Sequence, residues 1–417
     1  MSALPRSLAR RFAVLLFLTA STTFAAADRA AADVRPEWVT AWAGPQQSTT
    51  TTLPLSTAGV TLREPVWLTV GGDQVRVKFS NAMNSTGPLT ITSASIGIRT
   101  SGSSVDAATL RTITFGGKGS VDVPIQGAVL SDPVALAVPA LTDVSISIYL
   151  LSPPAALTQY PGSRKVTAVF AGGDATLSAD MPAGTTTLTN GYLVSSVEVH
   201  NSSARGAVAC VGDSITAGVG SDAENLKWSD RLAARLAALP APRQLGVLGL
   251  GIAGNRVLSG ATGNPAALAR FDREVLGMAG LTHVILADGI NDLGSTALTP
   301  SLPPNAADVE EGVRQLVERA HARGVKVIAT TMGPVADFRN YQFIESKRLE
   351  YNHWLRTEGV KVVDGLVDFD AVLADPLLRD SVGAVVMRPA LASGDGIHPN
   401  DAGHQAMADA IDLLLLK

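Results

Sequence analysis

The sequence predicts an α/β protein in which a β-rich region is followed by a parallel sheet with helices on both faces. Between about Trp38 and Val199, apolar and polar residues alternate with a period of two, the pattern of half-buried strands. After about Asn201, short apolar runs take turns with amphipathic stretches, as in a parallel sheet whose crossovers are helices. The length of 417 residues supports two domains, because single cores seldom grow beyond roughly 250–300 residues.

In the first region, three stretches show the alternation clearly: Val75–Phe79, Leu89–Ile98 and Val144–Ile148. The glycine-rich segments Gly71–Asp73 and Gly116–Gly119 lie between such runs, and we expect them to form hairpin turns. This pattern predicts an all-β domain over residues 38–200, an antiparallel sandwich or a jelly-roll-like fold.

In the second region, residues 201–417, strands and helices are predicted in alternation. The apolar runs expected to be strands are 207–211, 245–248, 283–287, 325–329 and 360–363. The amphipathic stretches expected to be helices lie near 228–239, 264–279, 307–323, 345–358 and 400–416. Gly324 is placed to end the third of these helices. Binding sites in such sheets lie at the carboxyl ends of the strands, so the residues after each run are the first candidates.

The N-terminus has the features of a secretory signal peptide over residues 1–27. Arg6, Arg10 and Arg11 precede the apolar run Phe12–Ala20, and the small residues Ala25–Ala27 follow it. A membrane anchor is the alternative, but a span needs about 20 apolar residues and this run is shorter. We expect residues 28–37 to be a linker, and the mature protein to be secreted or periplasmic with no membrane span.

Composition and charge narrow the possible partners. The chain is 46% hydrophobic, which supports packed cores and excludes a disordered protein. Its net charge of -4 and the absence of a basic cluster give no reason to expect nucleic acid as a partner. Cys210 is the only cysteine and lies in an apolar run, so we expect a buried, inert strand residue rather than a catalytic thiol.

The segment Gly212-Asp213-Ser214 directly follows the first predicted strand of the parallel sheet. This position presents the serine hydroxyl at the carboxyl edge of the sheet and at the start of a helix. A helix start supplies free N–H groups and a partial positive charge, which suit an oxyanion. Taken alone, however, Ser214 could merely cap the helix.

Two further segments follow the next two strands. Gly251-Ile252-Ala253-Gly254-Asn255 follows the second strand, and Gly289-Ile290-Asn291-Asp292 follows the third. Glycine allows the backbone to approach a ligand closely, and Asn291 can direct a neutral amide donor into a site. Each segment alone could be an ordinary loop, but their placement at successive strand ends favours Gly254 and Asn291 as oxyanion donors.

Near the C-terminus, Asp395 and His398 lie in one loop that Pro399 leads into the last helix. A serine nucleophile needs an imidazole to take its proton, and the imidazole needs a carboxylate to fix its tautomer. A surface pair and a metal site are the alternatives; no third ligand lies at a familiar spacing, so no metal is expected. No cofactor is expected either. The remaining histidines are expected to be structural: His200, His283, His321, His353 and His404.

Together these residues resemble the four sequence blocks of the SGNH hydrolases, also called GDSL esterases. The blocks are Gly212-Asp213-Ser214-Ile215, Gly254, Gly289-x-Asn291-Asp292 and Asp395-x-x-His398-Pro399, and the resemblance runs from about residue 205 to the end. It implies a flavodoxin-like three-layer α/β/α domain with Ser214 as the nucleophile and Asp395 and His398 as the acid and base. It also implies an oxyanion hole made by the Ser214 N–H, Gly254 and Asn291.

Two residues depart from the pattern of that family. Ile215 replaces the usual leucine, a change that conserves volume. Asp288 precedes the glycine of the third block and would oppose negative charge in the oxyanion hole unless it points away or is paired. The Gly-x-Ser-x-Gly motif is absent, which disfavours the α/β-hydrolase fold.

The whole chain, with "WVTAWAGP" near the start of the β region and "DGIHPNDAGHQAMADAID" near its end, also resembles secreted bacterial SGNH esterases of the xylan-esterase-like branch. This resemblance implies ester substrates on polysaccharides, commonly acetyl groups. We therefore expect a secreted serine esterase, above all a carbohydrate O-acetyl esterase. Two alternatives stay open: a lipase or arylesterase on short acyl esters, and a glycan-binding protein whose SGNH domain is idle or transfers acetyl groups.

Overall fold

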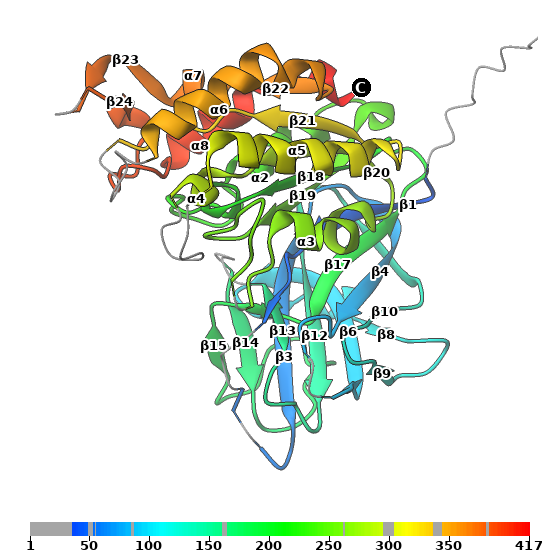
Figure 1. The fold of residues 1–417 in the computed structure, drawn as a ribbon. Helices are drawn as coiled ribbons and strands as arrows, with labels where there is room; N and C mark the ends of the chain where they lie inside the picture. Colours follow the sequence, from blue (N-terminus) through cyan, green and yellow to red (C-terminus); the bar gives the residue numbers. More distant parts are fainter. Residues whose placement is uncertain are drawn as a thin grey trace, which may run out of the picture. The chain divides into compact units, whose positions relative to one another are not determined.

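The computed structural model describes residues 36–48, 53–54, 56–84, 87–160, 165–261, 263–294, 304–336, 344–380 and 383–417. The predicted signal peptide and most of the predicted linker lie outside these residues. Residues Arg35–Lys417 form one compact unit, in which a β-rich N-terminal region precedes a mixed α/β region (Figure 1). The division of this unit into domains at residues 200 and 201 stays a prediction.

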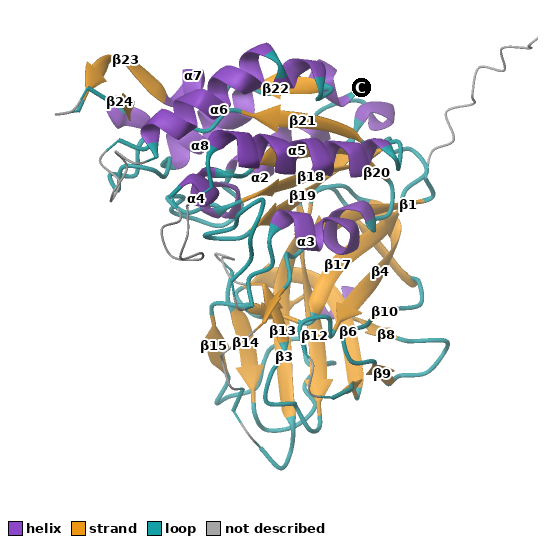
Figure 2. Ribbon diagram, in the orientation of Figure 1, coloured by secondary structure: helices purple, strands orange, loops and turns teal. Residues whose placement is uncertain are grey.

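The N-terminal region contains two larger antiparallel sheets (Figure 2). The first sheet consists of β1 (Trp38–Ala43), β17 (Val194–His200), β4 (Gly72–Ser80) and β10 (Ala128–Leu130), with β11 (Val134–Val138) also paired to β4. The second consists of β15 (Thr186–Leu188), β14 (Thr167–Phe170), β3 (Val60–Leu68), β12 (Thr142–Leu150), β6 (Ser93–Ser101) and β7 (Ser104–Val105), with β8 (Arg111–Ile113) also paired to β6.

Shorter strands complete this region: β2 (Gln47–Ser48), β13 (Thr158–Tyr160) and β16 (Gly191–Tyr192) form one small sheet, and β5 (Leu89–Ile91) and β9 (Val121–Val123) form another. A single 3-10 turn, η1 (Ala107–Thr109), is the helical structure among the described residues between 36 and 200. The alternation predicted for β4 is confirmed, because Val75, Val77 and Phe79 are fully buried.

The two predicted hairpin turns have different outcomes. Gly71–Asp73 does not connect paired strands, because β3 and β4 lie in different sheets and the chain crosses between the sheets at this point. Gly116 and Gly117 do form a tight turn, bridged by Phe115 and Lys118, with φ of 58° and 77°. A two-residue hairpin turn of type I′ requires positive φ at both central residues, and glycine adopts this conformation without steric cost.

The C-terminal region contains a parallel sheet with the strand order β19-β18-β20-β21-β22. Its strands are β18 (Gly206–Gly212), β19 (Leu245–Gly251), β20 (Leu281–Ala287), β21 (Lys326–Thr330) and β22 (Gly365–Val367). The first four match their predictions. The fifth was predicted at 360–363, where the chain instead forms the 3-10 turn η5 (Gly359–Lys361). A four-residue apolar run cannot distinguish a strand from a helical turn, and Val360 is exposed.

Helices lie where the amphipathic stretches predict them. They are α2 (Trp228–Ala237), α3 (Ala267–Phe271) with the π turn η3 (Asp272–Leu276), α5 (Ala306–His321), α6 (Glu345–Thr357), and α8 (Asp401–Asp409) with η7 (Leu413–Leu416). Short elements add α1 (Ser214–Ala217), η2 (Ala241–Arg243), α4 (Ile290–Leu293), α7 (Phe369–Leu373), the pair β23 (Ala374–Arg379) and β24 (Val385–Met387), and η6 (Pro389–Leu391). Gly324, with φ of 69°, follows α5 as predicted. In the part of the chain that the structure describes, no helix has the length and apolar character to cross a bilayer.

Successive residues of β18 pack into two different hydrophobic clusters. Val208 and Cys210 belong to a cluster with residues of α2 and α8, whereas Ala209 and Val211 belong to a cluster with residues of α5 and α6. Cys210 is fully buried, as predicted, and burial raises the pKa of its thiol, which keeps the thiol protonated and inert.

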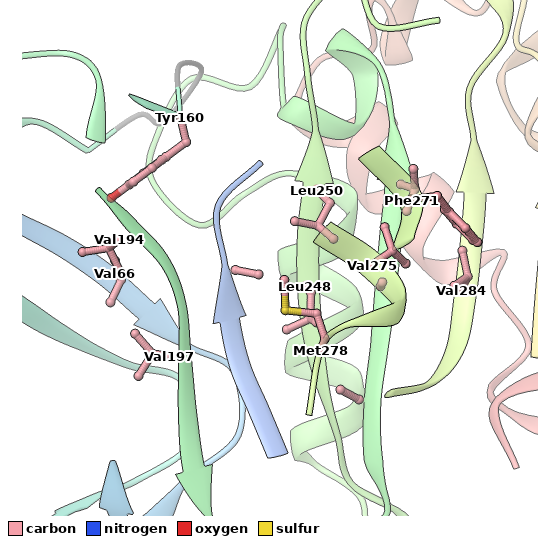
Figure 3. Packing of buried hydrophobic residues seen from close by; sticks show 14 of the residues in the cluster. Val66, Tyr160, Val194, Val197, Leu248, Leu250, Phe271, Val275, Met278 and Val284 are labelled. Atoms are coloured by element: carbon pink, nitrogen blue, oxygen red, sulfur yellow. The ribbon is translucent and has the colours of Figure 1, made fainter. Parts of the chain in front are cut away.

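The second of these clusters also contains residues of the β-rich region. Figure 3 shows Val66 and Val197 on one side of β1, the dark-blue strand at the centre of the view, and Leu248 and Val275 on the other side. All four residues belong to one cluster. Hydrogen bonds join the regions as well: the Thr40 N–H donates to the Ala279 carbonyl at 3.0 Å, and the Val247 N–H donates to Thr69 Oγ1 at 2.8 Å. The Thr69 hydroxyl thus satisfies a backbone donor on β19, an edge strand of the parallel sheet.

Candidate active site

Ser214 is the first residue of α1, and Asp213 alone separates it from the end of β18. Asp213, not Ser214, caps this helix, because its Oδ1 accepts the Ile215 N–H at 2.9 Å. The turn also requires glycine at position 212, where a Cβ would lie 2.3 Å from the Ala287 carbonyl oxygen. The serine hydroxyl is therefore not used as a helix cap and is free to make another contact.

That contact is with His398. Its Nε2 lies 2.8 Å from Ser214 Oγ, although the two residues are 184 positions apart. The other ring nitrogen, Nδ1, lies 2.5 Å from Asp395 Oδ2. The structure thus brings Ser214, His398 and Asp395 into one hydrogen-bonded chain, the arrangement of a serine nucleophile, its base and the carboxylate that orients the base.

Asp395 is held in its ionised form by hydrogen bonds. Partial burial acts to raise its pKa, but the His398 N–H, the His398 ring and the Ile397 N–H all donate to the carboxylate, and the net effect lowers the pKa to about 2. At neutral pH, Asp395 is therefore ionised and can accept a hydrogen bond from His398 Nδ1, which orients the ring.

Contacts between two loops bring the histidine to the serine. A Cβ at Gly220 would lie 2.1 Å from the Pro399 carbonyl oxygen, so the loop after α1 packs directly on the loop of His398. Asp401, the first residue of α8, accepts the Asp222 N–H at 3.1 Å through Oδ1. This bond joins the loop after α1 to the start of the helix that follows His398. The His398 carbonyl in turn accepts the Ser393 N–H at 2.9 Å.

Gly254 lies in the loop that follows β19, and Asn291 lies in the short helix α4 that follows β20; β19 and β20 are the two neighbours of β18 in the sheet. Asn291 Nδ2 donates to the Asn255 carbonyl at 3.0 Å, so its side chain is fixed beside the residue that follows Gly254. Gly254 has a φ of 73°, and no atom lies near the place of a Cβ. The structure therefore brings these two residues together through Asn255.

Asp292 holds the loop of Gly254 in place. Its two carboxylate oxygens accept the N–H groups of Val257 at 2.8 Å and Leu258 at 3.0 Å. Burial outweighs these hydrogen bonds and raises the pKa of Asp292 to about 6. Asp292, which follows β20, thus binds the loop that follows β19, and β18 lies between these two strands in the sheet.

Asp288, the residue that departs from the family pattern, is 5% exposed. Its Oδ1 accepts the N–H of Gly289 at 2.8 Å, and its Oδ2 has no hydrogen-bond partner among the described residues. Burial, with the nearby carboxyl groups of Asp213 and Asp292, raises its pKa well above the usual range, and Arg270 compensates only in part. The neutral carboxylic acid is therefore favoured, and that form does not oppose an oxyanion.

Two positioning residues were not identified from the sequence. His404 is buried in α8, where Nδ1 accepts the Trp228 N–H at 3.3 Å and Nε2 lies 3.3 Å from the Val219 carbonyl, so it ties down the chain after α1. Arg270 donates from Nη2 to Asn255 Oδ1 at 2.8 Å and so fixes the residue that holds Asn291. A charged residue within the apolar stripe of a predicted helix was the available signal for Arg270.

The other histidines lie away from this chain of contacts. His200 and His321 form surface pairs with Asp73 and Asp364, both at 2.7 Å, and His283 is buried in β20. His353 is an exposed residue of α6. Within the described ranges, no three His, Cys, Asp or Glu residues come together as metal ligands would.

Comparisons with known proteins relate part of the chain to a family of hydrolases. Residues 210–406 match the model of the GDSL-like Lipase/Acylhydrolase family. No curated protein matches the chain.

Several solved structures resemble about half of the chain. One, a member of the lipolytic protein G-D-S-L family from Veillonella parvula, is 18% identical, with 49% of this chain and 94% of that chain covered and a TM-score of 0.35. A GDSL-like lipase from Bacteroides thetaiotaomicron is 20% identical, with 50% and 86% covered and a TM-score of 0.35. A catalytic mutant of an acetylxylan esterase from Geobacillus stearothermophilus is 21% identical, with 49% and 90% covered and a TM-score of 0.37.

Proposed function

Because residues 210–406 belong to the GDSL-like lipase/acylhydrolase family of hydrolases, we propose that the chain is a serine esterase acting through an acyl-enzyme, with Ser214 as its nucleophile. The observation that carries the proposal is the contact of His398 Nε2 with Ser214 Oγ at 2.8 Å. General-base catalysis needs the base within hydrogen-bond reach of the proton that it removes.

In the proposed reaction, His398 takes the hydroxyl proton as Ser214 Oγ attacks the ester carbonyl carbon. The protonated ring, stabilised by Asp395, then gives this proton to the leaving alkoxide, and the acyl group remains on Ser214. Water, deprotonated by His398, attacks the acyl-enzyme and releases the carboxylic acid. The Ser214 N–H, the Gly254 N–H and the Asn291 amide would stabilise the oxyanion in both stages.

We also propose the finer architecture that the sequence resemblance implies: a flavodoxin-like three-layer domain preceded by a sandwich or jelly-roll-like domain. The packing of alternate β18 residues into two clusters, one with α2 and α8 and one with α5 and α6, supports the three layers.

For the substrate, we propose an acylated carbohydrate, above all an O-acetyl ester on a polysaccharide. This proposal rests on the resemblance carried by the residues near Trp42 and around His398. Secretion belongs with it, since polysaccharides of this kind lie outside the cell. Sequencing the N-terminus of the protein recovered from the medium or periplasm tests it: a start near residue 28 supports removal of a signal peptide, and retention in the cytoplasm contradicts it.

A specific observation favours esters of apolar acyl groups as the second candidate. Ile215 and Ile397, the chain neighbours of Ser214 and His398, line a pocket together with several apolar residues and with Asp213 and Asp288, although Ser214 and His398 themselves do not line it. Other lining residues include Ile290, Val335 and Phe369. A scan of p-nitrophenyl esters from acetyl to decanoyl separates the candidates: a steep loss beyond butyryl supports the acetyl esterase, and a maximum at longer chains supports the lipase or arylesterase.

The decisive experiment is the Ser214→Ala substitution, measured with p-nitrophenyl acetate. We expect a loss of kcat of about 10⁶-fold, because removal of a nucleophile leaves only binding and oxyanion stabilisation. The control is Ser203→Ala, at an exposed serine in the loop before β18. Hydrolysis by Ser214→Ala at the wild-type rate would contradict the proposal.

A further inference from the structure

A second cleft is lined by residues that follow α1, with neither Ser214 nor His398 among them. Strands β1 and β3 contribute one wall, with Trp42 and Trp67. The segment from Ala217 to Asp230 and strand β19 contribute the other, so both the β-rich region and the α/β region line it.

The aromatic residues of this cleft have unused surface and unused donors. Trp42 and Trp67 are both half-buried, and among the described residues neither indole N–H has a hydrogen-bond partner. The ring of Trp42 is fixed by an edge-on contact with Tyr160, whose centroid is 5.1 Å away. A rigid aromatic ring with a free N–H offers a face for the C–H groups of a sugar and a donor for its hydroxyls.

The charged groups that line the cleft have ionic partners both inside and outside the lining. Lys165 pairs with Asp143, which lies outside the lining, and is 4.0 Å from Glu224; Lys227 lies 4.0 Å from Asp230. Arg99, also outside the lining, donates to Glu224 at 2.8 Å. Two lysines and two carboxylates thus balance, and a cleft with balanced charges favours a neutral ligand rich in hydroxyl groups over an anion or a cation.

Asn225 provides a further donor and acceptor in this wall. It has a φ of 60°, a left-handed conformation that a residue other than glycine seldom adopts. Its amide has no hydrogen-bond partner among the described residues, although it lines the cleft. Backbone strain of this kind clusters at sites that bind ligands.

The cleft is also close to the catalytic serine along the chain. Ala217 and Gly218, which line it, are at the end of the one-turn helix that Ser214 begins. Gly251, which also lines it, is the first residue of the segment that carries Gly254. Ser214 therefore lies about one helical turn, roughly 5.4 Å of rise, from residues that line the cleft.

We propose that this cleft is a saccharide subsite, in which Trp42, Trp67 and Asn225 bind unmodified neutral sugar units of the chain whose ester is cleaved at Ser214. The inference rests on the proposed esterase function and adds the part of the substrate that lies beyond the ester. It also assigns the β-rich region a direct role in holding the substrate.

The test measures binding without turnover, in the full-length mature protein carrying Ser214→Ala. Isothermal titration uses four probes at millimolar concentration: xylohexaose, cellohexaose, mannohexaose and the anionic hexagalacturonate. We expect a neutral hexasaccharide to bind, and Trp67→Ala to weaken that binding about tenfold, the size expected for one aromatic contact. Trp38→Ala is the matched control, since its ring lies in β1 against the Arg76 guanidinium and outside the cleft.

A second variant covers the case in which Trp67→Ala fails to fold. Asn225→Gly removes the amide and suits the backbone, and Gln126→Gly, at another left-handed but exposed position with φ of 55°, is its control. Asn225→Gly should weaken the neutral sugar about fivefold or more, the effect of one hydrogen bond. In the active enzyme, both variants should lower kcat/KM for an acetylated oligosaccharide relative to that for p-nitrophenyl acetate.

Three results would overturn the inference: no neutral hexasaccharide binds, only hexagalacturonate binds, or the variants lower both kcat/KM values equally. A failure of the proposed function looks different, because ester hydrolysis would then be absent while sugar binding by the Ser214→Ala protein could still be measured.

Discussion

Charged residues are buried in both regions of the protein, but they are partnered differently. In strand β3, Arg63 and Glu64 are buried side by side in the sequence and point to opposite faces. Near Ser214, the carboxyl groups of Asp213, Asp288 and Asp292 are buried beyond the ends of strands of the parallel sheet. Burial raises the pKa of Glu64 to about 8 and those of Asp213 and Asp292 to about 6, so desolvation acts on both groups.

The pair in β3 is fully hydrogen-bonded. Arg63 donates to the Ser147 hydroxyl and to the carbonyls of four loop residues, Ser103, Ala175, Ser178 and Ala179. Each oxygen of Glu64 accepts one bond at 2.8 Å, from the Tyr160 hydroxyl and from the Tyr192 N–H. These bonds tie distant loops to one strand, and they rigidify the region because every member is satisfied.

Of the aspartates beside Ser214, Asp292 has a hydrogen bond at each oxygen, but Asp288 does not. One oxygen of Asp288 has no partner among the described residues, and the carboxyl groups of Asp213 and Asp292 help to raise its pKa. The difference teaches that a buried charged group can serve stability when its hydrogen bonds are complete, as in β3, whereas a buried carboxyl with an unpaired oxygen, such as Asp288, marks a candidate functional site.

The largest loss of activity is expected from a change at Asp395. Unlike the buried acidic residues above, Asp395 is 48% exposed, and it pairs with the His398 ring. Asp395→Asn should lower kcat about 10⁴-fold, because the amide favours the wrong tautomer of the ring. Steady-state hydrolysis of p-nitrophenyl acetate measures it, with Asp409→Asn on the surface of α8 as the control. A decrease below tenfold would remove Asp395 from the triad.

Arg63→Met should lower the free energy of unfolding by about 3–5 kcal/mol, because four carbonyls and a hydroxyl lose a buried charged donor. Urea denaturation measures the loss. At urea concentrations below the unfolding transition, kcat should stay within about twofold of wild type, since Arg63 makes no hydrogen bond to a residue of the candidate active site. Arg111→Met, at an exposed arginine of β8, should have little effect. A large loss of kcat without a loss of stability would break the contrast between the regions.

Asn291→Ala should lower kcat by about 10²–10³, the effect of removing one oxyanion donor, and should leave KM nearly unchanged. Single-turnover kinetics with p-nitrophenyl acetate separate the chemical step from product release. Asn190→Ala, which removes an amide bonded to Gln159 in the β-rich region, is the control. Equal activities of the two variants would exclude Asn291 from the oxyanion hole.

The smallest effect has the opposite sign. Asp288→Asn should raise the free energy of unfolding by about 1–3 kcal/mol at neutral pH, because the amide, unlike the carboxyl group, does not have to take up a proton on burial. Because the folded-state pKa of Asp288 lies above its unfolded value near 3.9, the folded protein binds more protons above that pH and stability falls as the pH rises.

The gain from Asp288→Asn should therefore vanish near pH 4 and grow as the pH rises through the folded-state pKa. Urea denaturation at a series of pH values measures this growth. The control is Asp122→Asn, at an exposed carboxyl that accepts a hydrogen bond from the Thr90 hydroxyl; this variant should show little change. A stability difference that is independent of pH would show that Asp288 is not a titrating group in this range.

Much of the fold was predictable because side-chain periodicity is local. The alternation in β4 and the apolar runs of β18 to β21 follow from which residues can be buried together, so these elements were assigned from the sequence. The run at 360–363 was misassigned, since four apolar residues fit a 3-10 turn as well as a strand. Gly71–Asp73 was misread because a glycine-rich turn does not reveal which sheet the next strand joins.

The sequence by itself determined the elements and the reactive residues of this protein: the order of strands and helices, and Ser214, Asp395 and His398 as residue types suited to one reaction. Only the tertiary structure decided their distances, the burial of Asp288, and the cleft that Trp42 and Trp67 share with the loop after α1. The physical reason is that hydrogen bonds, desolvation and packing act across space, between groups that may be 184 positions apart in the chain.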